Sequence, residues 1–300
     1  MTSLDPISGW RMWMLGARIR TLPAAVVPVA VGAACAVGEG TDTAWWRALV
    51  ALVVALALQV GVNYANDYSD GVRGTDDDRR VGPVRLVGNG LAEPAAVKRA
   101  AILAFGVAGV AGAVLALVVG PELFVVGAAS LLAGWTYTGG PKPYGYLGLG
   151  EVFVFVFFGL VATVGTTYVL LEEIQTLSIV ASVAVGLWAT ALLVINNLRD
   201  IPGDTEAGKN TLAVRIGDGA TRWVFVVMHL AALGFALWAA FGFSRWGGLL
   251  VVLGLGQMIQ AIVDVRKGAK GPELIRVLGL TASVQLVSGL GLAIGLALSG

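Results

Sequence analysis

Nine runs of apolar residues, most of them long enough to cross a membrane as a helix, account for the greater part of this 300-residue chain. A helix needs about 20 apolar residues to span ~30 Å of hydrocarbon. Hydrophobic side chains make up 57% of the sequence and charged ones 13%, whereas soluble domains carry about 25% charged residues. The sequence therefore predicts an all-α, polytopic membrane protein with one membrane-embedded domain over residues 1–300, whose N-terminal segment 1–20 precedes the first span. The predicted spans are 22–38, 48–64, 97–120, 123–137, 152–171, 177–194, 223–243, 249–263 and 277–298.

The Lys and Arg residues gather on one side of these spans. With nine spans, that side holds the N-terminal segment and, within a residue or two, the segments 65–96, 138–151, 195–222 and 264–276. All of the 20 Lys and Arg residues except Arg47 and Arg245 lie there. Because positive residues mark the cytoplasmic side, we expect a multi-pass protein of the cell membrane with its N-terminus inside and its C-terminus outside. Most acidic residues lie on the same side, which this rule does not require.

Two motifs of carboxylate and amide residues follow the second and the sixth predicted spans. In each motif, polar residues recur at intervals of four (Asn66 and Asp70; Asn196, Asp200 and Asp204), which places them on one face of a helix, one turn apart. The motifs lie four helices apart, so we expect two related halves that face each other. Their residues are Asn66, Asp67 and Asp70 in the first motif and Asn196, Asp200 and Asp204 in the second.

The donor atoms of these motifs are typical of a site for a hard cation. Mg²⁺ prefers oxygen ligands and binds a few protein carboxylates together with substrate phosphates. Basic side chains beside the motifs would neutralise the charge of a diphosphate leaving group. The sequence therefore predicts a metal–diphosphate site on the cytoplasmic side. The candidate phosphate ligands are Arg73, Arg79, Arg80, Arg85, Lys142, Arg199 and Lys209.

A third segment on the same side, residues 137–151, is rich in Pro, Gly and Tyr. Pro and Gly set turns, so by itself the segment is more often a plain connecting loop. Next to the two motifs, however, Lys142 and the tyrosines Tyr137, Tyr144 and Tyr146 become candidate site residues. The charged run 76–80 is equally well explained as a solvated loop.

The chain resembles the UbiA superfamily of intramembrane aromatic prenyltransferases over nearly its whole length. Members of that family carry an Asn-Asp-x-x-Asp motif after the second helix and an Asp-x-x-x-Asp motif after the sixth, which the residues at 66–70 and 200–204 match. Within the superfamily the chain is most similar to the menaquinone-pathway branch that acts on 1,4-dihydroxy-2-naphthoate. That similarity lies in the stretches 17–28, 66–87, 137–141 and 209–217. One departure is Gly74, where many members have a further acid and where Asp76 could substitute.

The resemblance implies a mechanism and a set of partners. Two Mg²⁺ ions would bind the diphosphate of a polyprenyl donor, and Asp70, Asp200, Lys142 and Tyr137 would be the catalytic residues. The allylic cation would be attacked by the aromatic acceptor at its carboxylate-bearing carbon, with loss of CO₂, giving a demethylmenaquinone. The implied metal ligands are Asn66, Asp67, Asp70, Asp76, Asn196, Asp200 and Asp204, and the implied diphosphate ligands include Arg20, Lys142 and Lys209.

Two other functions remain open from the sequence. One is a prenyltransferase for another acceptor, such as 4-hydroxybenzoate or homogentisate. The other is an ion-coupled transporter, which also has repeated halves but places its ion site in broken helices near the membrane centre. The motifs here lie at span ends beside Lys and Arg, which favours the enzyme. The net charge of +1 indicates no nucleic-acid partner.

Overall fold

The computed structural model describes residues 9–40, 43–74 and 84–300. A short helix α1 (Trp10–Ala17) and a single 3₁₀ turn η1 (Ile19–Thr21) precede the long helices, and a second 3₁₀ turn, η2 (Tyr144–Leu147), lies between α5 and α6. The other helices of the bundle are α2 (Pro23–Cys35), α3 (Trp46–Arg73), α4 (Pro94–Val118), α5 (Glu122–Thr136), α8 (Thr176–Glu206), α9 (Leu212–Gly242) and α11 (Pro272–Leu298). Of these, α9 has a kink at Gly217, whose backbone conformation is not helical. Two further rods are composite: α6 (Gly150–Val154) continues through the π-helical η3 (Phe155–Val161) into α7 (Ala162–Leu171), and η4 (Trp246–Gly254) continues into α10 (Leu255–Arg266).

Each of the nine predicted apolar runs falls on one of these rods. Among the described residues, seven helices are long and apolar enough to cross a membrane, and the bent pair formed by residues 10–21 and α2 makes eight. The remaining run, 123–137, corresponds to α5, a shorter apolar helix. The prediction of an all-α, multi-pass membrane protein is therefore confirmed.

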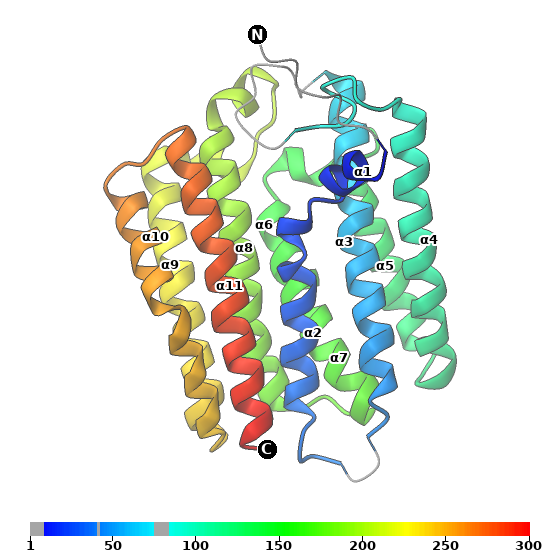
Figure 1. The fold of residues 1–300 in the computed structure, drawn as a ribbon, viewed down its shortest axis with the longest axis vertical. Helices are drawn as coiled ribbons and strands as arrows, with labels where there is room; N and C mark the ends of the chain where they lie inside the picture. Colours follow the sequence, from blue (N-terminus) through cyan, green and yellow to red (C-terminus); the bar gives the residue numbers. More distant parts are fainter. Residues whose placement is uncertain (1–8, 41–42, 75–83) are drawn as a thin grey trace.

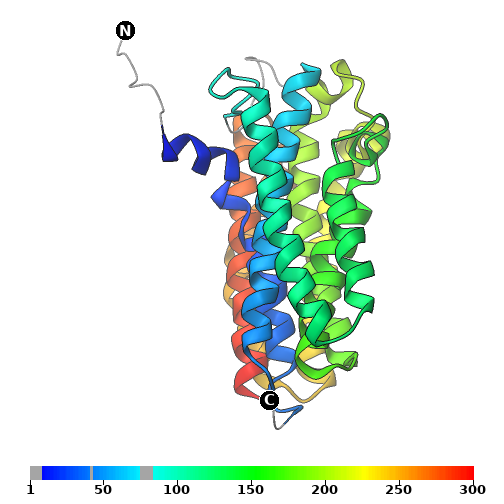
Figure 2. The ribbon, with the colours of Figure 1, turned by 90° about the vertical axis from the view of Figure 1, so that its right-hand side faces the viewer.

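The long helices run side by side along the longest axis of the molecule. Figure 1 shows α8 to α11 on one side of α2, and α3 to α5 on the other side. The end of α11 lies at the opposite end of the bundle from α1. Figure 2 shows that α1 projects from the bundle, and its segment makes an angle of 50° with α2. The exposed apolar side chains of this segment are Trp10, Met14, Leu15 and Ile19.

Close helix packing depends on paired glycines at one crossing. Gly159 of η3 faces Gly186 of α8, and a Cβ on Gly159 would lie 2.5 Å from the Cα of Gly186. Only glycine at both positions allows the two backbones to approach this closely. Small residues serve the same purpose generally between membrane helices, where lipid gives no hydrophobic advantage to bulkier contacts.

The helices α3 and α8 extend well beyond the apolar runs that predicted them. The runs end at residues 64 and 194, whereas the helices end at Arg73 and Glu206. Both polar motifs are therefore helical, as their spacing predicted. They lie in the last turns of the two helices, at the same end of the bundle as α1 (Figure 1).

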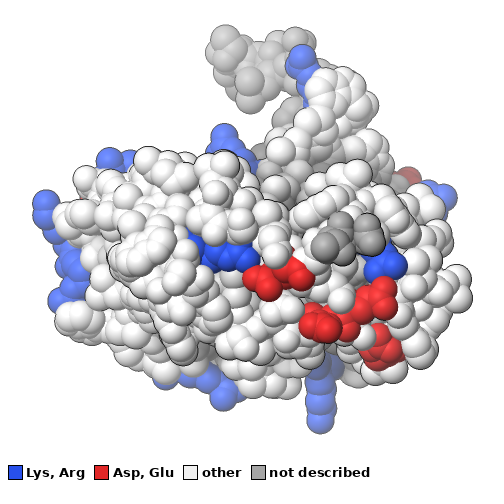
Figure 3. All heavy atoms as spheres, turned by 90° about the horizontal axis from the view of Figure 1, so that it is seen from below, with Lys and Arg blue, Asp and Glu red and all other residues white. Residues whose placement is uncertain are grey.

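The opposite end of the bundle carries few basic side chains. Figure 3 views this end and shows a largely uncharged face with acidic side chains grouped on one side. Arg47 pairs with Glu172 at 2.8 Å, and Arg245 pairs with Glu39 at 2.7 Å. These two arginines are the ones that the sequence assigns to this side.

Candidate active site

The two motifs meet at one cavity. Its volume is about 1650 Å³, which is larger than the ~300–1,000 Å³ typical of pockets for drug-sized ligands. Its polar end is lined from α3 by Asn66 and Asp70, and from α8 by Asn196, Asp200 and Asp204. Since residues four apart share one helix face, the spacing in the sequence accounts for this convergence.

Asp70 is held by two side chains from outside its own helix. The Tyr146 hydroxyl donates a hydrogen bond to Asp70 Oδ1 at 2.7 Å, and Lys209 Nζ lies 3.3 Å from Asp70 Oδ2. The ammonium group of Lys209 also lies 4.7 Å from the centre of the Tyr146 ring. Asp70 is only 4% exposed, and these two contacts hold its carboxylate in place at the polar end of the cavity.

In the second motif, Asp200 is paired with the adjacent residue Arg199. The Arg199 guanidinium donates two hydrogen bonds to Asp200, at 2.7 and 2.8 Å, in the bidentate geometry that arginine favours. After α8 ends, the chain turns back, and the backbone N–H of Lys209 donates to the carbonyl of Asp204 at 2.7 Å. This turn brings the Lys209 side chain to the polar end of the cavity.

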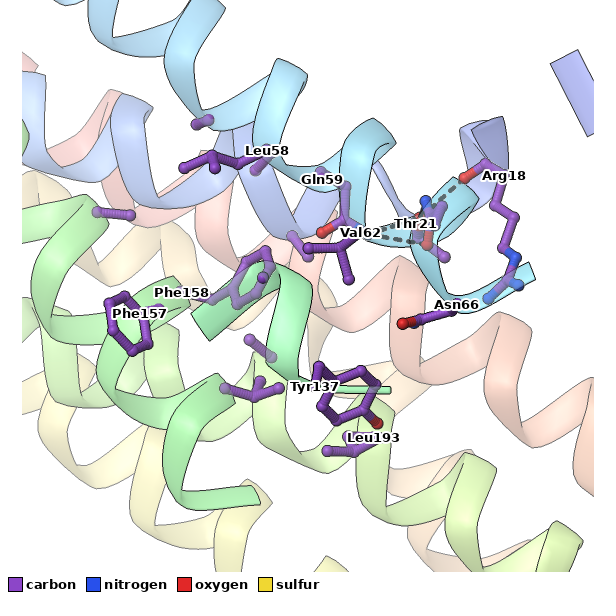
Figure 4. Close-up of a pocket in the computed structure, with 18 of the residues that line it drawn as sticks. Arg18, Thr21, Leu58, Gln59, Val62, Asn66, Tyr137, Phe157, Phe158 and Leu193 are labelled. Carbon is purple, nitrogen blue, oxygen red and sulfur yellow. Dashed lines mark hydrogen bonds between the residues drawn. The ribbon is translucent and has the colours of Figure 1, made fainter. Parts of the chain in front are cut away.

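The segment after α5 closes over α3. The Thr138 hydroxyl donates to Asn66 Oδ1 at 2.7 Å, which fixes the orientation of that amide. The Arg73 guanidinium donates to the carbonyl oxygens of Thr138 and Gly140. Tyr137 precedes this segment and lines the cavity opposite Asn66, as Figure 4 shows.

The donor set fits a metal ion that a phosphate-bearing ligand helps to bind. Among the residues that the structure describes, no three His, Cys, Asp or Glu side chains are arranged to hold a metal ion by themselves. Mg²⁺ commonly binds one or two carboxylates and takes its other oxygens from substrate phosphates and water. Carboxylates on two facing helices, with amide oxygens beside them, therefore suit Mg²⁺ together with a diphosphate.

Basic side chains surround the same end of the cavity. Three of the predicted diphosphate ligands line it: Arg20, Arg199 and Lys209. Arg85, another candidate phosphate ligand from the sequence, lines it as well. So does Arg18, whose role the sequence alone does not separate from that of Arg20. This concentration of positive charge suits an anionic ligand with several negative charges.

Three predicted site residues do not line the cavity. Lys142 has an exposed side chain. Arg73 ties the segment after α5 to α3 through the two carbonyl contacts described above. Asp67 accepts hydrogen bonds from the backbone N–H groups of Leu86 and Val87, each at 2.9 Å. Two further predicted residues, Asp76 and Arg79, lie outside the described residues, as does Arg80.

The position of Asp67 gives it a structural role that can be tested. Its side chain is fully buried, and replacement by Ala would leave the amides of Leu86 and Val87 without their partner. A buried donor without a partner costs about 1–3 kcal/mol. We expect Asp67→Ala to lower the free energy of unfolding by roughly 2 kcal/mol or more, measured as a lower thermal midpoint in detergent. An unchanged midpoint would contradict this role.

Away from the motifs, the cavity is apolar. Figure 4 shows Leu58 and Val62 of α3 on one side, with Phe157 and Phe158 of η3 on another. Leu193 of α8 lies beside Tyr137. The cavity thus joins a charged end to a long apolar interior, which suits a ligand with an anionic head and a hydrocarbon tail.

The sequence analysis missed several polar residues that line the cavity or contact its motifs: Thr21, Gln59, Asn63, Thr138 and Thr211. A signal was present for two of them. Gln59 and Asn63 precede Asn66 and Asp70 at intervals of four, three and four, which is the spacing of one helix face. The apolar residues around Gln59 and Asn63 made this stretch part of a membrane span in the prediction.

Comparison with known proteins adds independent evidence. The model of the UbiA prenyltransferase family matches residues 25–274. The chain is 47% identical to the 1,4-dihydroxy-2-naphthoate octaprenyltransferase of Mycobacterium tuberculosis over 293 residues, which cover 97% of this chain and 98% of the relative. It is 38% identical to the Escherichia coli protein of the same name over 261 residues, which cover 82% of each chain.

Solved structures share the fold at low sequence identity. A UbiA homolog from Aeropyrum pernix superposes with a TM-score of 0.67 at 16% identity, covering 92% of this chain and 96% of the other. A UbiA homolog from Archaeoglobus fulgidus bound to DMAPP and Mg²⁺ gives a TM-score of 0.66 at 14% identity, covering 94% and 99%. The arrangement of helices described above is therefore that of these proteins.

Proposed function

This chain belongs to the UbiA prenyltransferase family, and from that premise we propose that it transfers a polyprenyl group from a polyprenyl diphosphate to 1,4-dihydroxy-2-naphthoate, with loss of diphosphate and CO₂. The observation that carries the proposal is the single cavity that joins facing acidic and basic residues to an apolar interior. The relatives named above supply the identity of the acceptor.

We propose that Mg²⁺, as two ions, binds between the two motifs. The ligands would be Asn66 and Asp70 on α3 and Asn196, Asp200 and Asp204 on α8. When bound, Mg²⁺ would supply the positive charge that neutralises the departing diphosphate. The solved relative with DMAPP and Mg²⁺ supports this assignment.

The protein's own side chains assist departure of the diphosphate. Lys209 and Arg199 line the polar end and can donate to the diphosphate oxygens as negative charge develops on them. Tyr146 fixes the orientation of Asp70 by its hydrogen bond. The bond between the prenyl carbon and the bridging oxygen breaks, and its electron pair leaves with the diphosphate.

The remainder of the cavity protects and directs the allylic cation. Aromatic rings such as Tyr137 and Phe158 line it, and the faces of aromatic rings attract positive charge. The apolar walls also keep water from the cation. The carboxylate-bearing ring carbon of the naphthoate forms the new bond to the prenyl carbon. Loss of CO₂ then returns the electron pair of the broken carbon–carboxylate bond to the ring.

We further propose that the cavity's polar end lies on the cytoplasmic side of the cell membrane. The Lys and Arg residues outside the spans concentrate at this end, with only Arg47 and Arg245 at the other. Positive residues mark the cytoplasmic side of membrane proteins. Water-soluble naphthoate and the released diphosphate would then exchange directly with the cytoplasm.

Product analysis tests the proposed function. Purified protein in detergent is given Mg²⁺, a polyprenyl diphosphate and one of three acceptors: 1,4-dihydroxy-2-naphthoate, 4-hydroxybenzoate or homogentisate. We expect Mg²⁺-dependent prenylation of the naphthoate alone, with release of label from a labelled carboxylate. Prenylation of another acceptor instead would keep the chemistry and overturn the acceptor. The absence of any product from folded protein would contradict the proposal.

A further inference from the structure

Gln59 places a buried carbonyl oxygen beside the apolar part of the cavity. The residue lies on α3, lines the cavity and is only 6% exposed. Its Oε1 is fully buried and accepts no hydrogen bond from any residue that the structure describes. A buried polar atom without a partner costs about 1–3 kcal/mol. A ligand that donates a hydrogen bond to this oxygen would remove that cost.

The orientation of the Gln59 amide is fixed by its neighbours. The Thr21 hydroxyl donates its one proton to the carbonyl oxygen of Arg18 at 2.9 Å. Thr21 Oγ1 must therefore accept at its other contacts, which are Gln59 Nε2 and Asn63 Nδ2, each at 3.0 Å. Asn63 Nδ2 also donates to the carbonyl oxygen of Ala17 at 2.9 Å. This network directs the Gln59 nitrogen towards Thr21 and leaves the oxygen as the acceptor.

The position of Gln59 excludes the diphosphate as its partner. Gln59, Asn63, Asn66 and Asp70 share one face of α3, and Asn66 lies seven positions after Gln59. At 1.5 Å per residue, this separation is about 10 Å along the helix. Figure 4 shows Gln59 and Val62 between Thr21 and Phe158, deeper in the cavity than Asn66. A diphosphate held at the motifs lies beyond the reach of this oxygen, and it carries no proton to donate when fully ionised.

The two proposed substrates differ in their hydrogen-bond donors. A polyprenyl chain has no hydrogen-bond donor. A dihydroxynaphthoate has two hydroxyl groups on a flat apolar ring, which suits an apolar cavity with one fixed acceptor. Its 1-hydroxyl lies next to the carboxylate and donates to it, whereas the 4-hydroxyl proton is free and lies farther from the carbon that reacts.

We infer that Gln59 Oε1 accepts a hydrogen bond from the 4-hydroxyl of the naphthoate acceptor, and that Gln59 is thereby a specificity-determining residue for the acceptor. This inference rests on the proposed function. Thr21 and Asn63 are then positioning residues, because they orient the Gln59 amide and do not themselves bind the 4-hydroxyl group.

The test compares two acceptors that differ only in this hydroxyl. Equilibrium dissociation constants of 1,4-dihydroxy-2-naphthoate and 1-hydroxy-2-naphthoate are measured under reducing conditions, with Mg²⁺ and inorganic diphosphate present so that no turnover occurs. We expect the wild-type protein to prefer the dihydroxy compound by about tenfold or more. In Gln59→Met, which keeps the length of the side chain, we expect this preference to fall to within about twofold, because the acceptor oxygen that distinguishes the two compounds is absent.

A matched control separates recognition from a general effect on folding. Gln285 on α11 is also fully buried and is not among the residues that line the cavity, so Gln285→Met should leave the preference unchanged. Gln59→Asn provides a second variant, which retains the amide but withdraws the oxygen by one methylene, and it should also lose the preference. The KM for polyprenyl diphosphate should change little in either Gln59 variant.

The outcomes separate this inference from the proposed function. If a folded Gln59 variant keeps the full wild-type preference, the inference is overturned while the proposed function stands. If the wild-type protein neither binds nor prenylates the dihydroxynaphthoate, the proposed function fails and the inference falls with it. Loss of the preference in the Gln285 variant as well would overturn the assignment of the effect to Gln59.

Discussion

Asp70→Asn is expected to lower kcat by about 10²–10³-fold or more while the protein remains folded. The substitution keeps the size of the side chain but removes the negative charge that a metal ion needs at the end of α3. The side chain lines the cavity, so little packing is lost. Asp200→Asn should have an effect of similar size, because it removes the facing carboxylate on α8. The measurement is kcat at saturating substrates, beside the thermal midpoint.

A control carboxylate lies at the same end of the bundle. Asp264 of α10 accepts a hydrogen bond from Gln260 at 2.7 Å and pairs with Arg276, and it is not among the residues that line the cavity. Asp264→Asn should leave kcat within about twofold of wild type, because the side chain does not line the cavity and its partner Arg276 is exposed to solvent. If Asp70→Asn and Asp200→Asn both retained activity, the metal assignment would have to be abandoned.

Lys209→Ala is expected to lower kcat/KM for polyprenyl diphosphate by about 10²-fold. Lys209 lines the polar end of the cavity and lies 3.3 Å from Asp70. Truncating one partner of a buried, hydrogen-bonded charge pair costs about 2–5 kcal/mol. The dependence of the rate on polyprenyl diphosphate concentration measures the effect, with the naphthoate held saturating.

Lys142→Ala serves as the comparison for Lys209→Ala. The sequence alone gave both lysines the same role, whereas the structure places the Lys142 side chain in an exposed position outside the cavity lining. We expect Lys142→Ala to change the KM for polyprenyl diphosphate by no more than about twofold, as for a solvent-exposed charge. A larger loss for Lys142→Ala than for Lys209→Ala would reverse the assignment.

The sequence could predict those site residues that recur at helical intervals along one helix. Asn66 and Asp70 are four residues apart, so a helix of any length brings them to one face. The same rule explains why Asp67 does not share that face. One residue along a helix turns the side chain by about 100°, which directs Asp67 away from the cavity and towards the backbone of Leu86 and Val87.

Residues in the loop after α5 could not be predicted in the same way. Lys142 and Tyr146 lie in one turn-rich segment, and no periodicity tells which of them faces α3. In the structure it is Tyr146 that faces α3, and its hydroxyl donates a hydrogen bond to Asp70. Gln59 was missed for a different reason: only the buried network around Thr21 shows that its oxygen is held as an acceptor.

The bend between α1 and α2 affects how the polyprenyl diphosphate donor reaches the cavity. Trp10, Met14, Leu15 and Ile19 are exposed apolar side chains, and the same residues line the cavity. Apolar side chains on a short helix that projects beside a membrane bundle favour the boundary between headgroups and acyl chains. A lipid-borne donor can then enter from the bilayer without passing through water. The rate should accordingly follow the mole fraction of polyprenyl diphosphate in the membrane or micelle, and dilution with inert lipid should slow the reaction at constant bulk concentration.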